Sequence, residues 1–509
     1  MTFDNLKTRR GGVKHHFRQG QNRLSQPHSY QTGSNFMATF ATPNVSNPTP
    51  DLVLAYQPTR LRRWAVGTLV YGPAGLVALF AWLLIGDFVL NMKERSTNPI
   101  SLIVLRDFGA SVWLVGLLVG SIPSAIGLLL GPFIGVVSDR HRGRWGRRIP
   151  FILLSAPVIL ITMTGLGLSR PIGDWVGTRF HLGPVASHVG TFALFWTVLE
   201  IATIISNSLF GALINDVVPQ AVIGRFFGLF RLVGLLAGVI FNYWLVGKTE
   251  QHAQILFIGL GVLYSCGIVL MCLRVKEGQY PPVPPRDPSQ RREILRPLII
   301  YLKECYGDPF LLWFFFVTTL GGLTLAPVNT YAVYHAHSVN MSDDTYGKCV
   351  AMSYAISMVL AFPLGYLADR FHPLRVGMAT AGFYAVATAW AFFFASSASA
   401  FFVALAMHTV VSGMYITATA SLAQRLLPRQ KFAEITSAGG ILGAFIAMFV
   451  PPALGGFIEW MHHEYRYVFL LASILATLTM VSYAVLIRQF VARGGDNGYV
   501  APHEGPPAA

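Results

Sequence analysis

The chain has 509 residues, of which 53% are hydrophobic and only 12% are charged, whereas a soluble globular protein carries about 25% charged residues. Its mean hydropathy is +0.52. So few charges cannot cover a soluble protein of this size, and many apolar runs reach the roughly 20 residues that a membrane helix needs. The composition therefore excludes a soluble protein and predicts an all-α polytopic membrane protein.

The net charge of +15 would suggest a nucleic-acid partner in a soluble protein. In a membrane protein it is better explained by lysines and arginines gathered in the loops on one side of the bilayer. We therefore expect no nucleic-acid partner. The four cysteines are scattered (Cys266, Cys272, Cys305 and Cys349), so neither a disulfide framework nor a metal site is predicted.

Residues 1–63 are rich in Ser, Gln, Asn and Pro and carry scattered basic residues, which predicts a disordered basic tail. The tail contains no apolar run of the kind found in signal peptides. Met37 is a second possible start codon, so whether residues 1–36 are translated stays open.

Apolar runs predict twelve membrane-spanning helices, in chain order at 80–103, 112–137, 150–168, 190–214, 226–246, 253–273, 310–333, 346–367, 374–396, 399–424, 435–458 and 467–488. Residues 274–309 are Pro-rich and charged, which is typical of a linker. The sequence therefore predicts an N-terminal six-helix half (64–273), a cytoplasmic linker (274–309), a C-terminal six-helix half (310–490) and a disordered tail (491–509).

Basic residues fix the expected orientation. Arginines precede the first span, fill the loop between spans two and three, and recur in the linker and after spans eight and ten. All of these segments fall on one side if there are twelve spans, and the positive-inside rule then places both termini in the cytoplasm. The expected location is the plasma membrane, that is, the bacterial inner membrane.

The two halves repeat each other. "GVVSDRHRGRWGRR" has a counterpart in "GYLADRFHPLR", and a second echo pairs "VPQAVIGRF" with "LPRQKFAEI". Fewer residues separate the two members of the second pair than those of the first. The N-terminal half is therefore longer between its two motifs, which predicts a longer external loop around 169–189. Parallel repeats about an axis normal to the membrane are a known transporter architecture.

The string "SDRHRGRWGRRIPF" between spans two and three, its weaker copy between spans eight and nine, and the two sets of six spans resemble the major facilitator superfamily over residues 64–490. The extended string is most similar to the glycoside–pentoside–hexuronide cation symporters and the sucrose transporters. The resemblance implies the major facilitator fold, with twelve helices in two pseudo-symmetric six-helix halves. The second copy departs from the pattern at Pro373, where a Gly or Arg is usual.

The resemblance also implies a cytoplasmic gate. Asp139 is expected to close the inner face by pairing with a neighbouring helix and meeting a helix N-terminus, and the arginines would pair with carboxylates or anionic lipid headgroups. The alternative is that the arginines only set topology. The expected gate comprises Asp139, Arg140, Arg144, Arg147, Arg148, Asp216, Arg225, Asp369 and Arg370, with Arg231 in the same network.

A two-half transporter binds its substrate near the midplane, where ionisable groups are costly and usually functional. An apolar window would end the first span at Leu90, but the repeat with span seven extends it to 103. Asp87, Asn91 and Glu94 then share one helix face inside the membrane, where two carboxylates suit a proton or sodium coupling site. The alternative is a pair of carboxylates in an external loop.

Other polar residues fall near the midplane of their spans. Glu200 and Asn207 share a face of span four, and the alternative role for Glu200 is structural pairing with a basic residue. His408 lies in span ten, where a lone histidine is often a hydrogen-bonded core residue. Asn329 and Tyr331 lie near Pro327 in span seven and could hydrogen-bond a hydroxylated substrate.

The predicted function is secondary active transport of a small solute, coupled to a proton or sodium gradient by alternating access, in a monomer that contacts anionic lipid headgroups. A sugar or glycoside as substrate rests on the resemblance. The alternatives are proton-driven efflux of amphipathic compounds and a non-transporting membrane assembly factor on the same fold. No nucleotide-binding motif or nucleophile motif is visible, so neither an enzyme nor a cofactor is expected.

Overall fold

The computed structural model describes residues 63–280, 303–428 and 431–502. The chain divides into Met1–Arg60 and Leu61–Ala509, and all the described residues belong to the second unit. The predicted N-terminal tail, up to residue 62, and linker residues 281–302 lie outside the described part.

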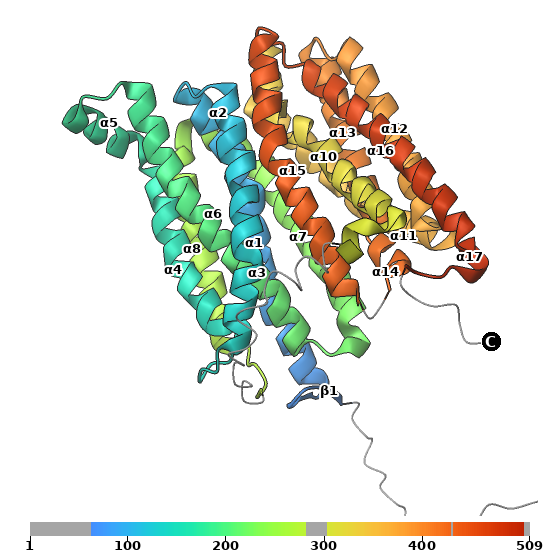
Figure 1. Cartoon of the computed structure of the whole chain (residues 1–509). Helices are drawn as coiled ribbons and strands as arrows, with labels where there is room; N and C mark the ends of the chain where they lie inside the picture. The colour runs from blue at the N-terminus through green and yellow to red at the C-terminus, as the bar shows by residue number, and fades with distance from the viewer. Residues whose placement is uncertain (1–62, 281–302, 429–430, 503–509) are drawn as a thin grey trace, which may run out of the picture. The chain divides into compact units, whose positions relative to one another are not determined.

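Long helices make up both halves (Figure 1). Those of the N-terminal half are α1 (Pro73–Asp107), α2 (Val112–Gly116) continuing through a π-helix, η1 (Leu117–Ser121), into α3 (Ile122–Arg140), then α4 (Ile149–Gly167), α6 (Pro184–Val217), α7 (Ile223–Trp244) and α8 (Thr249–Arg274). Those of the C-terminal half are α10 (Pro309–Ser338), α11 (Asp343–Phe371), α12 (Pro373–Phe394), α13 (Ala398–Thr419), α15 (Phe432–Trp460) and α16 (Tyr467–Ala492).

Among the described residues, eleven segments are long and apolar enough to cross a membrane, and one of these, Gln220–Arg274, contains both α7 and α8. The segments therefore amount to twelve helices, each overlapping one of the predicted spans. Short elements complete the chain: a hairpin of β1 (Trp64–Val66) and β2 (Leu69–Tyr71), α5 (Ser169–Phe180), 3₁₀ turns η2 (Gln220–Val222) and η3 (Val246–Lys248), α14 (Leu422–Leu426) and α17 (Gly495–Gly498).

The charged stretch after Leu90 stays helical. α1 runs without a break from Pro73 to Asp107, as the internal repeat predicted and the apolar window did not. Asp87 and Lys93 are almost fully buried, so this part of the helix faces protein, where polar partners offset the cost of burying charge.

Two segments differ from the sequence-based expectation. The stretch expected as a long loop, 169–189, contains the helix α5, which packs against α6 and joins it through His188 Nε2, 2.7 Å from Asp174 Oδ1. Residues expected in a disordered C-terminal tail extend α16 and fold back on the C-terminal half. The Arg493 guanidinium lies 3.1 Å from the Asp308 carboxylate, and the Tyr499 hydroxyl donates to the Leu426 carbonyl at 2.7 Å.

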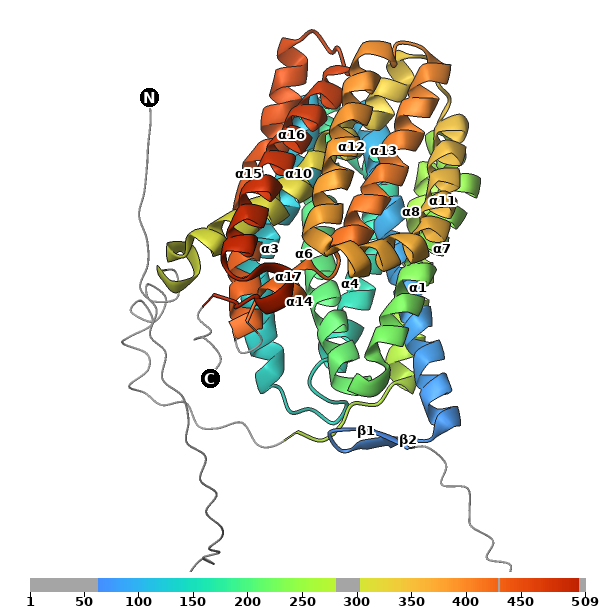
Figure 2. The ribbon, with the colours of Figure 1, turned by 90° about the vertical axis from the view of Figure 1, so that its right-hand side faces the viewer.

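Helices pack first within each half. α1 contacts α7 and α8, and α4 contacts α6 and α8; in the C-terminal half α16 contacts α10 and α12, and α11 contacts α13. The halves meet where α2, η1 and α3 pack on α15, and where α7 packs on α11 (Figure 2). We call the side that carries loop 140–148 the arginine-loop side, and the other the opposite side.

Glycines permit the close approach of the halves on the opposite side. A Cβ at Gly116 would lie 2.5 Å from the Pro451 carbonyl oxygen, and one at Gly120 would lie 2.4 Å from Pro451 Cγ. A side chain at either position would separate the two helices, so these two glycines are required for the observed packing.

Candidate transport site and gate

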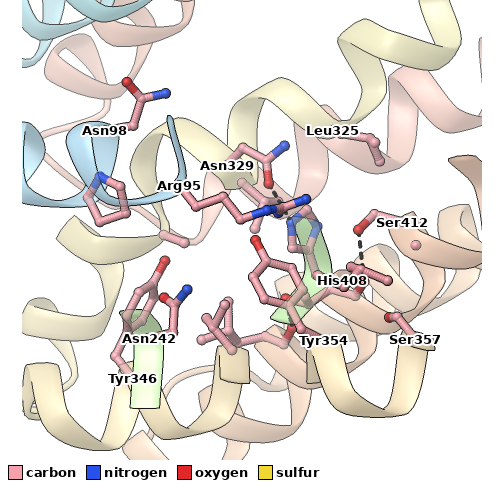
Figure 3. A pocket seen from close by; sticks show the side chains of 18 of the residues that line it. Arg95, Asn98, Asn242, Leu325, Asn329, Tyr346, Tyr354, Ser357, His408 and Ser412 are labelled. Atoms are coloured by element: carbon pink, nitrogen blue, oxygen red, sulfur yellow. Dashed lines mark hydrogen bonds between the residues drawn. The ribbon is translucent and has the colours of Figure 1, made fainter. Parts of the chain in front are cut away.

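A central cavity of about 440 Å³ lies between the two halves (Figure 3). α1 and α7 line it from the N-terminal half, and α10, α11 and α13 line it from the C-terminal half. More than half of its lining residues carry polar or charged side chains: Asn91, Glu94, Arg95, Asn98, Arg231, Asn242, Asn329, Tyr346, Tyr354, Ser357, His408, Thr409 and Ser412. Of the predicted binding residues, Asn91, Glu94, Asn329 and His408 are therefore brought to one cavity.

His408 is held by a chain of hydrogen bonds. Its Nδ1 lies 2.6 Å from the Tyr384 hydroxyl, and its Nε2 lies 3.0 Å from Asn329 Oδ1. A phenol donates to Nδ1, which leaves the proton of a neutral imidazole on Nε2 to donate to Asn329. The Asn329 Nδ2 group then remains available as a hydrogen-bond donor (Figure 3).

The two α1 carboxylates have different surroundings. Asp87 is fully buried behind the cavity; its Oδ1 accepts from Asn91 Nδ2 at 2.5 Å, and its Oδ2 has no hydrogen-bond partner among the described residues. Glu94 is exposed and lines the cavity, and its Oε1 accepts from Asn207 Nδ2. Asn91 thus connects Asp87 to the cavity, and Glu94 brings α1 into contact with α6.

A buried lysine lies on the adjacent face of α1. Lys93 Nζ donates to Thr203 Oγ1 at 2.8 Å and lies 5.8 Å from the centroid of the Tyr264 ring. Its ammonium group interacts electrostatically with Glu94 and Glu200. Glu200 is not among the residues that line the cavity, and with Lys93 it forms a charged layer behind it.

Two arginines add positive charge to the cavity. The Arg95 guanidinium lies 4.9 Å from the centroid of the Tyr354 ring, and Arg231, on α7, interacts electrostatically with both Arg95 and Tyr354. The sequence suggested that Arg231 belongs to the cytoplasmic network, but the structure places it in the cavity lining. With Lys93 they make three cations in this region, and Asp87, Glu94 and Glu200 are three carboxylates, so the formal charges are equal in number.

Tyr331, expected near the substrate, lies instead in the contact between the halves on the opposite side. Its hydroxyl donates to the Pro451 carbonyl at 2.8 Å. Further bonds join the halves there: Ser121 Oγ donates to the Met448 carbonyl at 2.5 Å, and the Trp113 amide donates to Glu459 Oε1 at 3.0 Å.

On the arginine-loop side, four of the predicted gate residues form one cluster. The Arg148 guanidinium contacts Asp139 at 2.5 Å and Asp216 at 3.3 Å. Arg147 contacts the same two carboxylates, at 3.3 Å and 2.5 Å. The cluster ties the end of α3 to the end of α6 and the start of α4, all within the N-terminal half.

The helix N-terminus in this cluster binds a carboxylate that the sequence analysis did not single out. Glu277, from the first part of the linker, accepts from the backbone amides of Arg147, Arg148 and Ile149 at 2.7–2.8 Å. These amides open α4, where the helix dipole favours an anion. The expected helix-terminus role of Asp139 is thus filled by Glu277, and only its position just after span six could have indicated this.

The remaining gate residues are dispersed. In the described part of the chain, Arg140, Arg144 and Arg225 are exposed and make no ion pair. Asp369 pairs with Arg425 of α14, and the Arg370 guanidinium lies 5.4 Å from the Phe371 ring centroid. Pro373 opens α12 at a position that suits proline, so the second copy of the motif becomes a one-residue turn.

A model of the MFS/sugar transport protein family matches residues 102–427. Solute carrier family 45 member 4 of Mus musculus is 29% identical over 172 residues, which cover 32% of this chain and 22% of the mouse protein. Sucrose transport protein SUC4 of Arabidopsis thaliana is 30% identical over 142 residues, 26% of each chain. Sucrose transport protein SUC3 of the same plant is 34% identical over 85 residues, 17% of this chain and 12% of the relative. The matches thus span about a quarter of these relatives or less.

Solved structures share the fold. A bacterial homologue of the human lysosomal transporter Spinster, inward-facing and unoccupied, aligns with a TM-score of 0.59 and 15% identity over 82% of this chain and 97% of that chain. A D-xylose–proton symporter aligns with a TM-score of 0.54 and 14% identity over 80% and 96%. The architecture is therefore that of the major facilitator transporters. The family model matches well over half of the length of this chain. This integral membrane protein therefore belongs to the MFS/sugar transport protein family.

Proposed function

We propose that this protein is a secondary active transporter that carries a small hydroxylated solute, a sugar or a glycoside, through the central cavity. The observation that carries the proposal is the cavity itself, which both halves line with amides, hydroxyls and a neutral imidazole. Such groups both donate to and accept from hydroxyls, which suits a polyol. The names of the plant relatives, sucrose transport proteins, support the same substrate class.

The coupling ion is a proton or sodium bound at the α1 carboxylates. In the part of the chain that the structure describes, Asp87 Oδ2 is a buried acceptor without a hydrogen-bond partner, and Asn91 connects this carboxylate to the cavity lining. Glu94 offers a second carboxylate in the cavity itself. A cation bound at either group changes the charge balance with Lys93, Arg95 and Arg231, and so links substrate binding to the gradient.

The cycle proceeds by alternating access, with the arginine-loop side in the cytoplasm and the protein in the plasma membrane, that is, the bacterial inner membrane. The positive charge of that side supports this orientation. The bonds that join the halves lie on the opposite side, whereas the Asp216 and Asp369 clusters each stay within one half. This arrangement supports an inward-facing state, closed outside.

The test is uptake into proteoliposomes of purified full-length protein, with radiolabelled sugars, glycosides and amphipathic cations, under an imposed pH or sodium gradient. We expect uptake of a sugar or glycoside that a gradient of one ion drives and that collapse of this gradient abolishes. Asp87→Asn and Glu94→Gln are expected to abolish the gradient dependence, while the exposed α5 carboxylate variant Asp174→Asn leaves it intact. Transport of amphipathic cations alone would move the assignment to efflux, and no transport of any compound would contradict it.

A further inference from the structure

A histidine and two carboxylates converge on the opposite side of the protein, away from the central cavity. Glu250 is the second residue of α8, His337 lies at the end of α10, and Asp343 is the first residue of α11. The ligand atoms of the three side chains lie within 4.8 Å of one another. We propose that they form a binding site for a divalent transition-metal ion of the Zn²⁺ type, which joins the two halves.

Asp343 is the observation that points to a ligand. Its side chain is 5% exposed, and neither carboxylate oxygen has a hydrogen-bond partner among the described residues. His337 Nε2 lies 2.8 Å from Asp343 Oδ1, but the two atoms are not aligned for a hydrogen bond, and within the described part of the chain Nε2 also lacks a hydrogen-bond partner. A buried charge left unsatisfied is costly, and a cation held between the three side chains, whose ligand atoms lie within 4.8 Å of one another, would satisfy it.

The local charge matches a divalent cation. The Arg106 guanidinium lies 2.8 Å from Glu250 Oε1 and 3.1 Å from Asp107 Oδ1. With Asp343 these groups sum to three negative charges and one positive charge, so the three carboxylates and Arg106 together carry a net charge of minus two. Among the described residues, Arg106 bonds one oxygen of Glu250, Oε1, and Oε2 stays available to an ion.

The donor set selects the kind of metal. One imidazole nitrogen with two carboxylate oxygens suits Zn²⁺ and related transition metals, whereas Mg²⁺ and Ca²⁺ prefer oxygen ligands alone. Three protein ligands would leave a fourth position for water. Glu250 belongs to the N-terminal half and the other two ligands to the C-terminal half, so a bound ion stabilises the arrangement in which the halves meet on this side.

The test uses detergent-purified full-length protein, with any histidine tag removed and the sample treated with chelator. ZnCl₂ is titrated while Tm and bound zinc are measured, with MgCl₂ and CaCl₂ as comparison ions. We expect a saturable rise in Tm of several degrees with zinc that chelator reverses, and no such rise with Mg²⁺ or Ca²⁺. An equal response to all three ions, or no response to zinc, would overturn the assignment.

Variants identify the ligands. His337→Gln and Asp343→Asn are expected to weaken zinc binding at least about tenfold, because even the loss of a group that only orients a ligand costs that much. The matched controls are the exposed side chains His252→Gln and Glu464→Gln on the same side, which should bind zinc as the parent does. Zinc binding that survives both ligand variants refutes the site. Because no substrate is present in this assay, its result is independent of whether the transport proposal holds.

Discussion

Two neighbours determine the tautomer of His408. The ring therefore orients Asn329 and also lines the cavity. The Tyr384 hydroxyl and Asn329 Oδ1 use both ring nitrogens. Protonation of this ring would break the bond from Tyr384, so the neutral form is built into the geometry. The sequence could locate His408 near the midplane but could not show that α12 supplies its partner.

We predict that His408→Ala lowers sugar affinity more than Tyr384→Phe does. The first change leaves a buried phenol without a partner and frees Asn329, at a cost of about 1–3 kcal/mol, whereas the second removes one hydrogen bond, worth about 1 kcal/mol. Ligand-dependent thermal shifts and uptake kinetics measure both. Equal affinity of the two variants and the parent would show that Asn329 needs no support from the ring.

The charged layer behind the cavity predicts non-additive effects. Lys93→Met removes the buried cation that faces Glu94 and Glu200 and should lower stability on the order of 3 kcal/mol. Adding Glu200→Gln removes a carboxylate that has lost its compensating charge, so the double variant should regain part of the lost Tm. A double variant as unstable as the sum of the two single variants would contradict electrostatic coupling across this layer.

At the scale of elements, the start of α4 depends on a residue from the far end of the N-terminal half. The Glu277 carboxylate accepts hydrogen bonds from three backbone amides there. The Tyr280 hydroxyl donates to Glu277 Oε2 at 3.1 Å, and the Tyr280 ring centroid lies 4.1 Å from the Arg147 guanidinium. Burial raises the pKa of the Tyr280 hydroxyl well above its usual value, so it stays a donor at physiological pH. The first part of the linker therefore closes the arginine cluster.

We predict that Glu277→Ala lowers the thermal stability of the protein by the equivalent of about 1–3 kcal/mol, because three amides at a helix N-terminus lose a charged acceptor. The neighbouring exposed lysine offers a control, since Lys276→Ala removes a charge of the same loop without touching α4. Thermal unfolding in detergent compares the two variants. A larger loss for Lys276→Ala than for Glu277→Ala would refute the role of Glu277.

Helices were predictable from the sequence to different degrees. Long apolar runs fix the twelve spans because lipid leaves the backbone no other partner than itself. The charged part of α1 could be predicted as helix only from the internal repeat, because the apolar run ends at Leu90 and hydropathy alone would end the span there. α5 escaped prediction because it is short and amphipathic, and its exposed Trp175 and Phe180 look like loop residues when hydropathy is averaged over a long window.

At the scale of the whole molecule, the sequence predicted part of the cavity lining: the midplane positions of Asn329 and His408 and the shared helix face of the α1 residues. Asp87, Asn91 and Glu94 share a face of α1 by helical spacing alone. Arg231, Tyr354 and Ser412 line the same cavity from three other helices, and their convergence depends on how the halves pack, which spacing within one helix cannot indicate. The same reason explains why Tyr331, which lies between the cavity residues Asn329 and Ala332 of α10, meets Pro451 instead.

The packing of the halves predicts a variant that shifts the conformational equilibrium. Gly120→Val places side-chain atoms where Pro451 lies. This overpacking costs about 1–3 kcal/mol, and it arises only in the state in which α15 contacts η1. The population should therefore move about 5- to 150-fold toward the state open on the opposite side. Labelling of a cysteine placed at Asn98, in the cavity, by an impermeant maleimide added from that side should rise. Gly131→Val is the control, since nothing lies within 4 Å of a Cβ there. Unchanged labelling in Gly120→Val, or an equal rise in Gly131→Val, would show that the contact with Pro451 does not hold the halves together.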